Sequence, residues 1–323
     1  MSRSSHSKHG HGSPASTPPT DLLEGLSPAY PPAARVELAP ADMAFIIDVA
    51  EGCRTAMKTR PVVLPPLPSV AAQILRLSAN PDVHFNEVAT LIERDPNVTA
   101  AVLGTANSAL YGSVTLDNVR DAVVRLGVRT VADLAAAASM RGLFETRSDP
   151  RLPLHMLRWA QLSQHALTCA LVLSSESQRH RIGTSDRAFL TGMLHDFGRT
   201  SALLVVGNLL TREEIPALSP AVLDGVLEEL HVDLGVEFAT HWNLPPKVID
   251  IIRDHHSPNV QDSEIALLRL VSGLDELRMN PHHRAGLSAE VRAAAVVLSV
   301  DSRGARVLWQ QLKDTSASVR SLL

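Results

Sequence analysis

Seven polar side chains lie on helical faces that are otherwise apolar, and their types are those of metal ligands. His165 shares a face with Leu162, and Asp275 falls in a stripe with Leu268 and Val271. Neutral imidazoles and carboxylates form the usual nitrogen–oxygen ligand set of divalent transition metals. Five helices that point these groups inward could make one polar cavity in a bundle. The seven candidates are His165, His195, Asp196, His231, His255, His256 and Asp275.

The same residues also allow a structural interpretation without chemistry. A single inward-facing histidine is more often a core residue that is hydrogen-bonded to a backbone carbonyl than a ligand. An aspartate in an apolar stripe is harder to explain in this way, because a buried carboxylate is costly unless a cation or a metal pairs with it. His195 and Asp196 follow Phe189 and Leu194 at the end of an apolar run, so they could simply cap a buried helix.

The composition favours a helical protein that works in the cytoplasm. The 323 residues are 45% hydrophobic and only 3% aromatic, which favours helices packed through aliphatic side chains. A formal net charge of −4 disfavours a nucleic-acid binder. No apolar run reaches the roughly 18 residues of a membrane span, and no secretory signal is visible. Cys53 and Cys169 are expected to be buried free thiols in a reducing cytosol, with a disulfide as the alternative.

The helical pattern predicts an all-α, two-lobed bundle. Residues 1–40, rich in proline and without periodicity, are predicted to be a disordered tail, and 41–61 hold one helix. A leading lobe is predicted over 62–145 and a second lobe over 154–260, separated by the polar, proline-containing stretch 146–153. C-terminal helices in 261–323 complete the second lobe through Asp275. Beyond the boundary, helices are expected near 154–176, 185–197, 221–241, 246–256, 262–279, 288–300 and 303–313.

The order of these histidines and aspartates resembles the HD phosphohydrolase superfamily, and more fully its HDOD branch, the HD-related output domain of bacterial signalling proteins. The stretches "LPPLPSVAAQILRLSANPD", "IERDPNVTAAVLGTANSALYG" and "VRDAVVRLGVRTV" resemble the leading lobe of that family. "LTGMLHDFGR" and "ELHVDLGVEFATHWNLPPKVIDIIRDHHSP" resemble its HD-like lobe. The resemblance covers roughly Val62–Leu277 and implies that all seven candidates match metal ligands.

Two departures from the catalytic pattern bear on activity. Catalytic relatives hold one or two metals that activate water against a phosphoester, so the resemblance implies iron, manganese or zinc as the cofactor, if a metal is kept. The lysine that follows the His-Asp turn in cyclic-dinucleotide phosphodiesterases is Arg199 here, and "SPNVQDSE" replaces their Gly-Tyr-Pro stretch after His256. These losses argue against a cyclic-dinucleotide substrate, while the retained ligand set leaves metal binding open.

The resemblance therefore implies a non-catalytic regulatory module that binds a signalling partner protein or a small nucleotide ligand. The alternatives are a metal-dependent phosphohydrolase acting on a nucleotide or cyclic dinucleotide, and a helical scaffold with no ligand. Partners of the nucleic-acid or membrane class are not expected. Arg199, Asn107 and Tyr111 are the candidates for ligand binding; Asn107 and Tyr111 could equally do no more than end a helix of the leading lobe.

Overall fold

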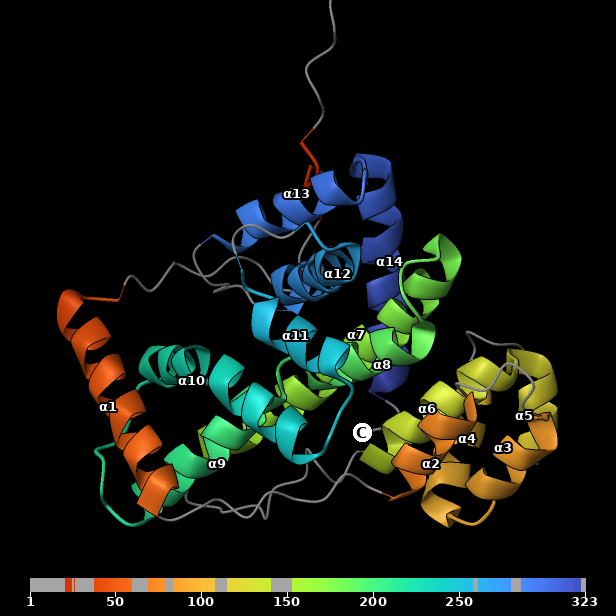
Figure 1. Ribbon diagram of the computed structural model, residues 1–323, viewed down its shortest axis with the longest axis horizontal. Helices are drawn as coiled ribbons and strands as arrows, with labels where there is room; N and C mark the ends of the chain where they lie inside the picture. Colours follow the sequence, from red (N-terminus) through yellow and green to blue (C-terminus); the bar gives the residue numbers. More distant parts are fainter. Residues whose placement is uncertain are drawn as a thin grey trace, which may run out of the picture.

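The computed structural model consists of helices and their connections over all the residues that it describes (Figure 1). No strand occurs among these residues, so the predicted all-α fold is confirmed. The described residues are 21–24, 26, 38–59, 69–78, 84–107, 115–140, 153–257, 261–279 and 286–320.

The leading lobe packs its helices around a small aliphatic core. Its elements are α2 (Ser69–Ser78), α3 (Phe85–Ile92), α4 (Pro96–Ala106), α5 (Val119–Leu126) and α6 (Val128–Met140). Asp95 caps α4, because its carboxylate accepts hydrogen bonds from two backbone amides of the first turn. Gly127 follows α5 with φ 84° and ψ 152°, a backbone conformation outside the left-handed helical region that glycine adopts more readily than other residues.

The HD-like lobe contains one helix that the sequence did not predict. Its elements are α7 (Pro153–His180), α8 (Ser185–Leu194), α9 (Phe197–Thr211), α10 (Pro220–His241), α11 (Pro246–Asp254) and α12 (Ser263–Met279). The sequence pattern predicted a helix running to residue 197, but α8 ends at Leu194 and α9 begins three residues later. Most of α9 is buried, including Val205 and Val206, so it shows no polar face from which a helical period could be recognised.

The N-terminal helix α1 (Pro40–Thr59) belongs in space to the HD-like lobe rather than to the leading lobe that follows it in sequence. It packs against α10 and α9, at the left of Figure 1. Its buried side chains include Ile46, Val49 and Cys53. Arg54 adds an ion pair to Glu229 of α10 at 3.3 Å.

Two C-terminal helices, α13 (Leu287–Val297) and α14 (Ser302–Val319), cover α12 on the far side from α1. A piece of the predicted disordered tail packs onto the same apolar cluster, through the side chains of Leu22, Leu23 and Leu26. For these residues the prediction of a disordered tail was wrong. Periodicity did not reveal them, because three leucines in a turn make no helical stripe.

The two lobes meet where α6 packs against α7. Buried apolar side chains from both lobes form one continuous cluster. A polar contact accompanies it: the Ser174 hydroxyl of α7 donates to the Asp133 carboxylate of α6 at 2.6 Å. Arg129 pairs with Asp133 at 3.2 Å and also with Asp186 of α8. The lobes therefore share both apolar and charged contacts.

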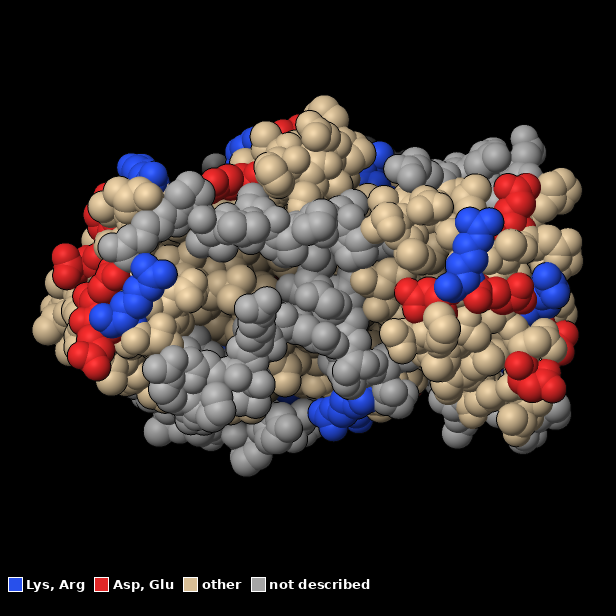
Figure 2. Space-filling view, turned by 90° about the horizontal axis from the view of Figure 1, so that it is seen from below, with Lys and Arg blue, Asp and Glu red and all other residues tan. Residues whose placement is uncertain are grey.

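The charged side chains on the face drawn in Figure 2 occur in small groups of mixed sign. Among the described residues on that face, no broad area of a single charge is visible. Within the described part of the chain, no helix is both long enough and apolar enough to span a membrane.

Candidate metal centre

All seven predicted ligand residues lie in one polar cluster inside the HD-like lobe. His165 comes from α7, His231 from α10 and Asp275 from α12, and each is at least nine-tenths buried. The other four residues lie where helices end. His195 and Asp196 form the turn between α8 and α9, and His255 and His256 follow the last residue of α11.

Two glycines allow the helices to approach closely enough to form this cluster. A Cβ atom on Gly198 would lie 1.8 Å from the carbonyl oxygen of His231, so α9 can start against α10 only with glycine at that position. A Cβ atom on Gly192 would lie 2.7 Å from the backbone of Ala170, one residue from Cys169. Both contacts are between backbones, so neither could be relieved by moving a side chain. The glycines therefore fix the distance between the His-Asp turn and its neighbours on α7 and α10.

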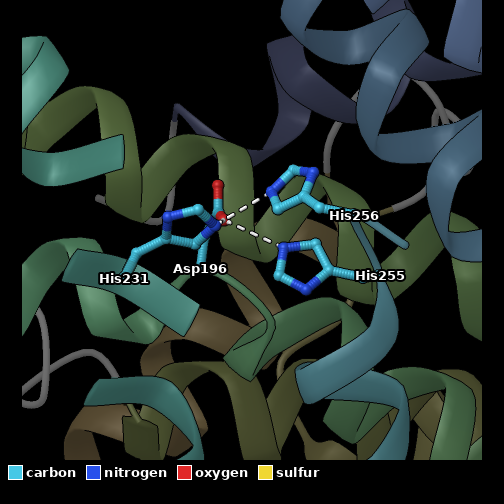
Figure 3. Close-up of side chains that lie close together, drawn as sticks. All are labelled: Asp196, His231, His255 and His256. Atoms are coloured by element: carbon cyan, nitrogen blue, oxygen red, sulfur yellow. Dashed lines mark hydrogen bonds and ion pairs between the residues drawn. The ribbon is translucent and has the colours of Figure 1, made fainter. Parts of the chain in front are cut away.

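The Asp196 carboxylate lies at the middle of the cluster, and its two oxygens face different groups. Oδ1 lies 3.7 Å from Nε2 of His231 and 3.7 Å from Nε2 of His255 (Figure 3). These separations are too long for hydrogen bonds, and the buried Asp196 Oδ1 and His255 Nε2 have no hydrogen-bond partner among the described residues. We call this half, with Asp196 Oδ1, His231, His255 and His256, the Oδ1 side.

Backbone carbonyls fix the orientation of the two imidazoles next to Oδ1. Nδ1 of His231 donates to the Glu228 carbonyl at 2.7 Å, and Nδ1 of His255 donates to the Ile252 carbonyl at 2.6 Å. The Nε2 atoms of both rings are thereby turned toward Asp196. A carbonyl bond to the second nitrogen is the usual support of a metal-binding histidine. Burial and the charge of Arg199 hold the pKa of His231 well below its usual value, which keeps that ring neutral at pH 7.

His256 completes the Oδ1 side. Its Nε2 lies 2.9 Å from Nε2 of His231. Because Nδ1 of His231 already carries a hydrogen, its Nε2 accepts the hydrogen bond and His256 donates it. Ligands held by one metal at about 2.0–2.2 Å lie roughly 2.8–3.6 Å from one another. The separations of 2.9 and 3.7 Å on this side come close to that range, so a cation could replace the shared proton.

The other half of the cluster, which we call the Oδ2 side, is connected by hydrogen bonds. Oδ2 of Asp196 lies 3.7 Å from His195 Nε2 and 3.9 Å from His165 Nε2. The Ser272 hydroxyl lies between these two rings, 3.1 Å from His195 Nε2 and 3.3 Å from His165 Nε2. Nδ1 of His195 donates to the Gly192 carbonyl at 3.0 Å. Burial lowers the pKa of His195 to about 3, so its Nε2 is an acceptor for the serine hydroxyl.

His165 is held as a cation on the Oδ2 side. Burial alone would lower its pKa, but the Asp275 carboxylate, which accepts its Nδ1–H, raises that pKa well above the usual value. Its Nδ1 donates to Asp275 at 2.8 Å, which leaves Nε2–H for Ser272. Arg278 donates to the other Asp275 oxygen at 2.6 Å. Burial raises the pKa of the Cys169 thiol to about 11, so the thiol beside His165 is neutral at pH 7.

Arg199, the residue in place of a lysine, pairs with acidic residues of three elements. Its guanidinium lies 3.0 Å from Asp196 Oδ2, 2.6 Å from Glu228 on α10 and 3.7 Å from Glu276 on α12. Although burial alone would raise it, the charge of this guanidinium holds the pKa of Asp196 well below its usual range. Asp196 is therefore ionised, and its negative charge already has one protein cation beside Oδ2.

Sequence reasoning missed Ser272, Glu228 and Glu276. Ser272 is three residues before Asp275 on α12, a helical spacing that puts both on one face, but serine gave no signal by itself. Among the predicted ligand-binding residues, Asn107 has a structural contact: its side-chain amide both donates to and accepts from the Leu116 backbone, at 2.8 and 2.7 Å. Tyr111 lies outside the described residues.

Comparison with known proteins places the chain in one family. The family model of the HDOD domain matches residues 64–258, and the chain belongs to the HDOD family. An uncharacterised protein of Treponema pallidum is 29% identical over 203 residues, which make up 60% of this chain and 38% of that protein. The chain thus spans well under half of that relative's length.

Solved structures of several bacterial proteins share the fold. A candidate metal-dependent phosphohydrolase from Shewanella amazonensis superimposes with a TM-score of 0.63 at 19% identity, over 85% of this chain and 99% of that one. An HDOD domain protein of unknown function from Geobacter sulfurreducens gives a TM-score of 0.61 at 21% identity, over 86% and 99% of the two chains. The family model ends before α12, so Ser272, Asp275 and Glu276 come from beyond the matched region.

Proposed function

We propose that this protein is a regulatory HDOD module that binds one divalent metal on the Oδ1 side of the cluster and does not hydrolyse phosphoesters. The observation that carries the proposal is the contrast around Asp196. Buried Oδ1 and His255 Nε2 lack hydrogen-bond partners among the described residues, whereas Oδ2 has an ion pair with Arg199 and the two rings beside it are joined through the Ser272 hydroxyl. Buried polar atoms without hydrogen-bond partners cost free energy, and a cation bound between Oδ1 and His255 Nε2 would remove that cost.

The donor set on the Oδ1 side suits iron, manganese or zinc. One carboxylate oxygen and up to three imidazole nitrogens form a mixed set of intermediate softness, typical of sites for these ions. Bound there, the ion would join the α8–α9 turn, α10 and the end of α11 into one unit. Asp196 would supply a negative charge, and His231 and His255 would supply neutral nitrogen atoms that are already oriented. Such an ion adds its binding free energy to the stability of the folded state.

The surroundings of Arg199 support a regulatory rather than a catalytic role. A phosphohydrolase needs positive charge that is available to its anionic substrate. Arg199 instead faces Asp196, Glu228 and Glu276, three carboxylates for one guanidinium. A phosphate that approached this position would meet net negative charge and would have to displace ion pairs. We therefore expect the output to be binding to a signalling protein partner or to a small ligand.

The alternative function is a metal-dependent phosphohydrolase that acts on a nucleotide or a cyclic dinucleotide. The feature that favours it is the second group of possible ligands, in which His165, His195 and Asp196 offer atoms within 4.8 Å of one another. With a metal on each side of Asp196, the carboxylate would bridge two ions. This arrangement requires His165 to give up its proton and its hydrogen bond to Ser272.

A turnover assay separates the two functions. Purified full-length protein is loaded with manganese, ferrous iron or zinc and incubated with cyclic dinucleotides, nucleoside phosphates and a general phosphodiester substrate. We expect no turnover above that of a His195→Ala, Asp196→Ala double variant. Turnover that requires manganese or iron and disappears in the double variant would contradict the regulatory proposal.

A second variant makes a negative result informative. Arg199→Lys restores the lysine typical of the cyclic-dinucleotide phosphodiesterases, whereas His180→Ala changes an exposed histidine outside the cluster and serves as the matched control. If carboxylate pairing of residue 199 excludes substrate, Arg199→Lys stays inactive as well, because the same three acidic groups surround it. Activity gained by Arg199→Lys alone would show that only one side chain separates this protein from an enzyme, and the proposed role would fail.

A further inference from the structure

A short segment of the N-terminal region lies against the C-terminal helices, more than 260 residues away in sequence. We call residues 21–24 and 26 the N-terminal clasp; in Figure 1 it is the short red segment beside α13. The Asp21 carboxylate accepts two hydrogen bonds from the Arg292 guanidinium of α13, at 3.0 and 2.9 Å. Arg306 of α14 donates to the Glu24 carbonyl at 3.5 Å. The paired oxygens and nitrogens define both the position and the direction of the segment.

The clasp combines this charge pair with leucine contacts and a defined turn. Leu22, Leu23 and Leu26 pack on the apolar cluster to which α12, α13 and α14 contribute. The Leu23 amide donates to the Asp21 carboxylate at 3.2 Å, so this carboxylate holds the turn and pairs with Arg292 at the same time. An acidic residue followed by leucines at the first, second and fifth positions is thus the pattern that this surface accepts.

The contacts of the clasp are those of a reversible association. The side chains of Asp21 and Arg292 remain 54% and 44% exposed, and an ion pair at such exposure contributes little. None of the three leucines is fully buried. A tethered segment nevertheless competes well, because the tether keeps its effective concentration at about the millimolar level. A free partner segment must therefore displace the clasp, and it can do so because the contacts of the clasp are weak.

We propose that the surface formed by Arg292 of α13 and Arg306 of α14, with the apolar side chains between them, is a docking site for a partner protein. The partner presents an acidic segment with leucines in the clasp pattern, and the clasp is its built-in competitor. The same helix α13 carries Glu290, whose carboxylate lies 3.9 Å from Nδ1 of His256 at the edge of the cluster. Helix α13 therefore contributes to the docking surface and also reaches the edge of the candidate metal centre. Binding of a partner to the docking surface requires no metal.

Binding of a peptide in trans tests the proposal with the full-length protein. The probe is a fluorescein-labelled peptide with the sequence of residues 17–28, TPPTDLLEGLSP. The clasp is disabled in the chain by Asp21→Ala, Leu22→Ala and Leu23→Ala together. Fluorescence anisotropy should show binding to this variant, and binding at least about tenfold weaker to the wild type, because the tethered clasp competes.

Arg292 provides the specificity control. Adding Arg292→Ala to the clasp-disabled chain should weaken peptide binding by up to about fivefold, the loss of one exposed ion pair, whereas Arg253→Ala, which removes an exposed arginine on α11, should leave it unchanged. With Arg292→Asp, a peptide that carries Asp21→Lys should bind again, which excludes simple loss of folding. The proposal is overturned if the clasp-disabled chain binds no peptide up to about 1 mM, the range of effective concentrations for such tethers. The proposal is also overturned if the clasp-disabled chain binds the peptide with the same affinity with and without Arg292→Ala.

Discussion

The two sides of the Asp196 carboxylate are built from the same kinds of residues and differ in how those residues are paired. On the Oδ2 side, Ser272 joins His195 to a protonated His165, whose other nitrogen binds Asp275. On the Oδ1 side, three imidazoles surround one oxygen, and two atoms that face one another at 3.7 Å have no hydrogen bond among the described residues. On one side hydrogen bonds and ion pairs join the polar groups, and on the other Asp196 Oδ1 and His255 Nε2 face one another without a hydrogen bond.

This difference shows why a ligand pattern in a sequence does not by itself define a metal site. A histidine becomes a ligand when its second nitrogen is fixed and its lone pair remains available. Both His231 and His255 have a fixed Nδ1, and Nε2 of His255 has no hydrogen-bond partner among the described residues, whereas His165 uses both nitrogens as donors. The serine on α12 therefore separates the structural side of the cluster from the side that can bind an ion.

The largest effect on stability is expected from the Oδ2 side. Asp275→Ala leaves Arg278 and the protonated His165 buried without their carboxylate, and should lower the free energy of unfolding by about 3–5 kcal/mol. Asp250→Ala breaks an exposed pair with Arg253 and should cost no more than about 0.5 kcal/mol. Urea denaturation of both variants measures the difference. A loss below about 1 kcal/mol for Asp275→Ala would show that the two sides are not distinct in the way described.

The next effect in size belongs to the Oδ1 side and depends on metal. A ligand present at 100 times its dissociation constant stabilises the folded state by about 2.7 kcal/mol. Addition of a strong chelator to the metal-loaded protein should therefore lower the free energy of unfolding by about 3 kcal/mol. In His255→Ala the chelator should have no effect, because one ligand is already missing. Equal chelator sensitivity in the two proteins would assign the metal to other residues.

A third buried carboxylate, that of Asp133 between the lobes, should make the stability of the protein depend on pH. Burial raises its pKa to about 6, despite its pairing with Arg129 and Ser174. Folding thus favours the protonated form of Asp133. Its contribution to the free energy of unfolding is complete below about pH 4 and is lost as the pH rises through about 6. Relative to Asp133→Asn, wild-type stability should fall by about 2–3 kcal/mol between pH 4 and pH 7, at 1.36 kcal/mol per pKa unit. If the difference in stability between wild type and Asp133→Asn stayed constant from pH 4 to pH 7, Asp133 would be ionised over that whole range.

The smallest expected effect concerns the N-terminal clasp. Leu22→Ala with Leu23→Ala removes contacts that are only partly buried, and should lower the free energy of unfolding by about 1 kcal/mol. Leu157→Ala, at a side chain that is 54% exposed, is the matched control and should be close to neutral. A thermal scan of both variants suffices. A loss of more than about 3 kcal/mol would mean that the clasp is part of the core.

Residue types and helical spacing were sufficient to predict the all-α fold and the convergence of seven polar groups. They could not predict α9, because a helix buried on all sides has no polar face. They could not divide the cluster either: the roles of His165 and His255 depend on Ser272 and on a carbonyl three residues upstream. The clasp was missed because its leucines show no helical period. Its position is defined only by tertiary contacts, such as the pair between Asp21 and Arg292.

Metal content tests the central claim most directly. The protein is purified without an affinity tag, with His6, His9 and His11 replaced by serine so that the N-terminal histidines bind none of the ion. Metal per chain is then measured in the parent protein, in His165→Gln and in His255→Gln. The account predicts about one ion per chain in the parent and in His165→Gln, and almost none in His255→Gln. Metal that disappears in His165→Gln and persists in His255→Gln would contradict it.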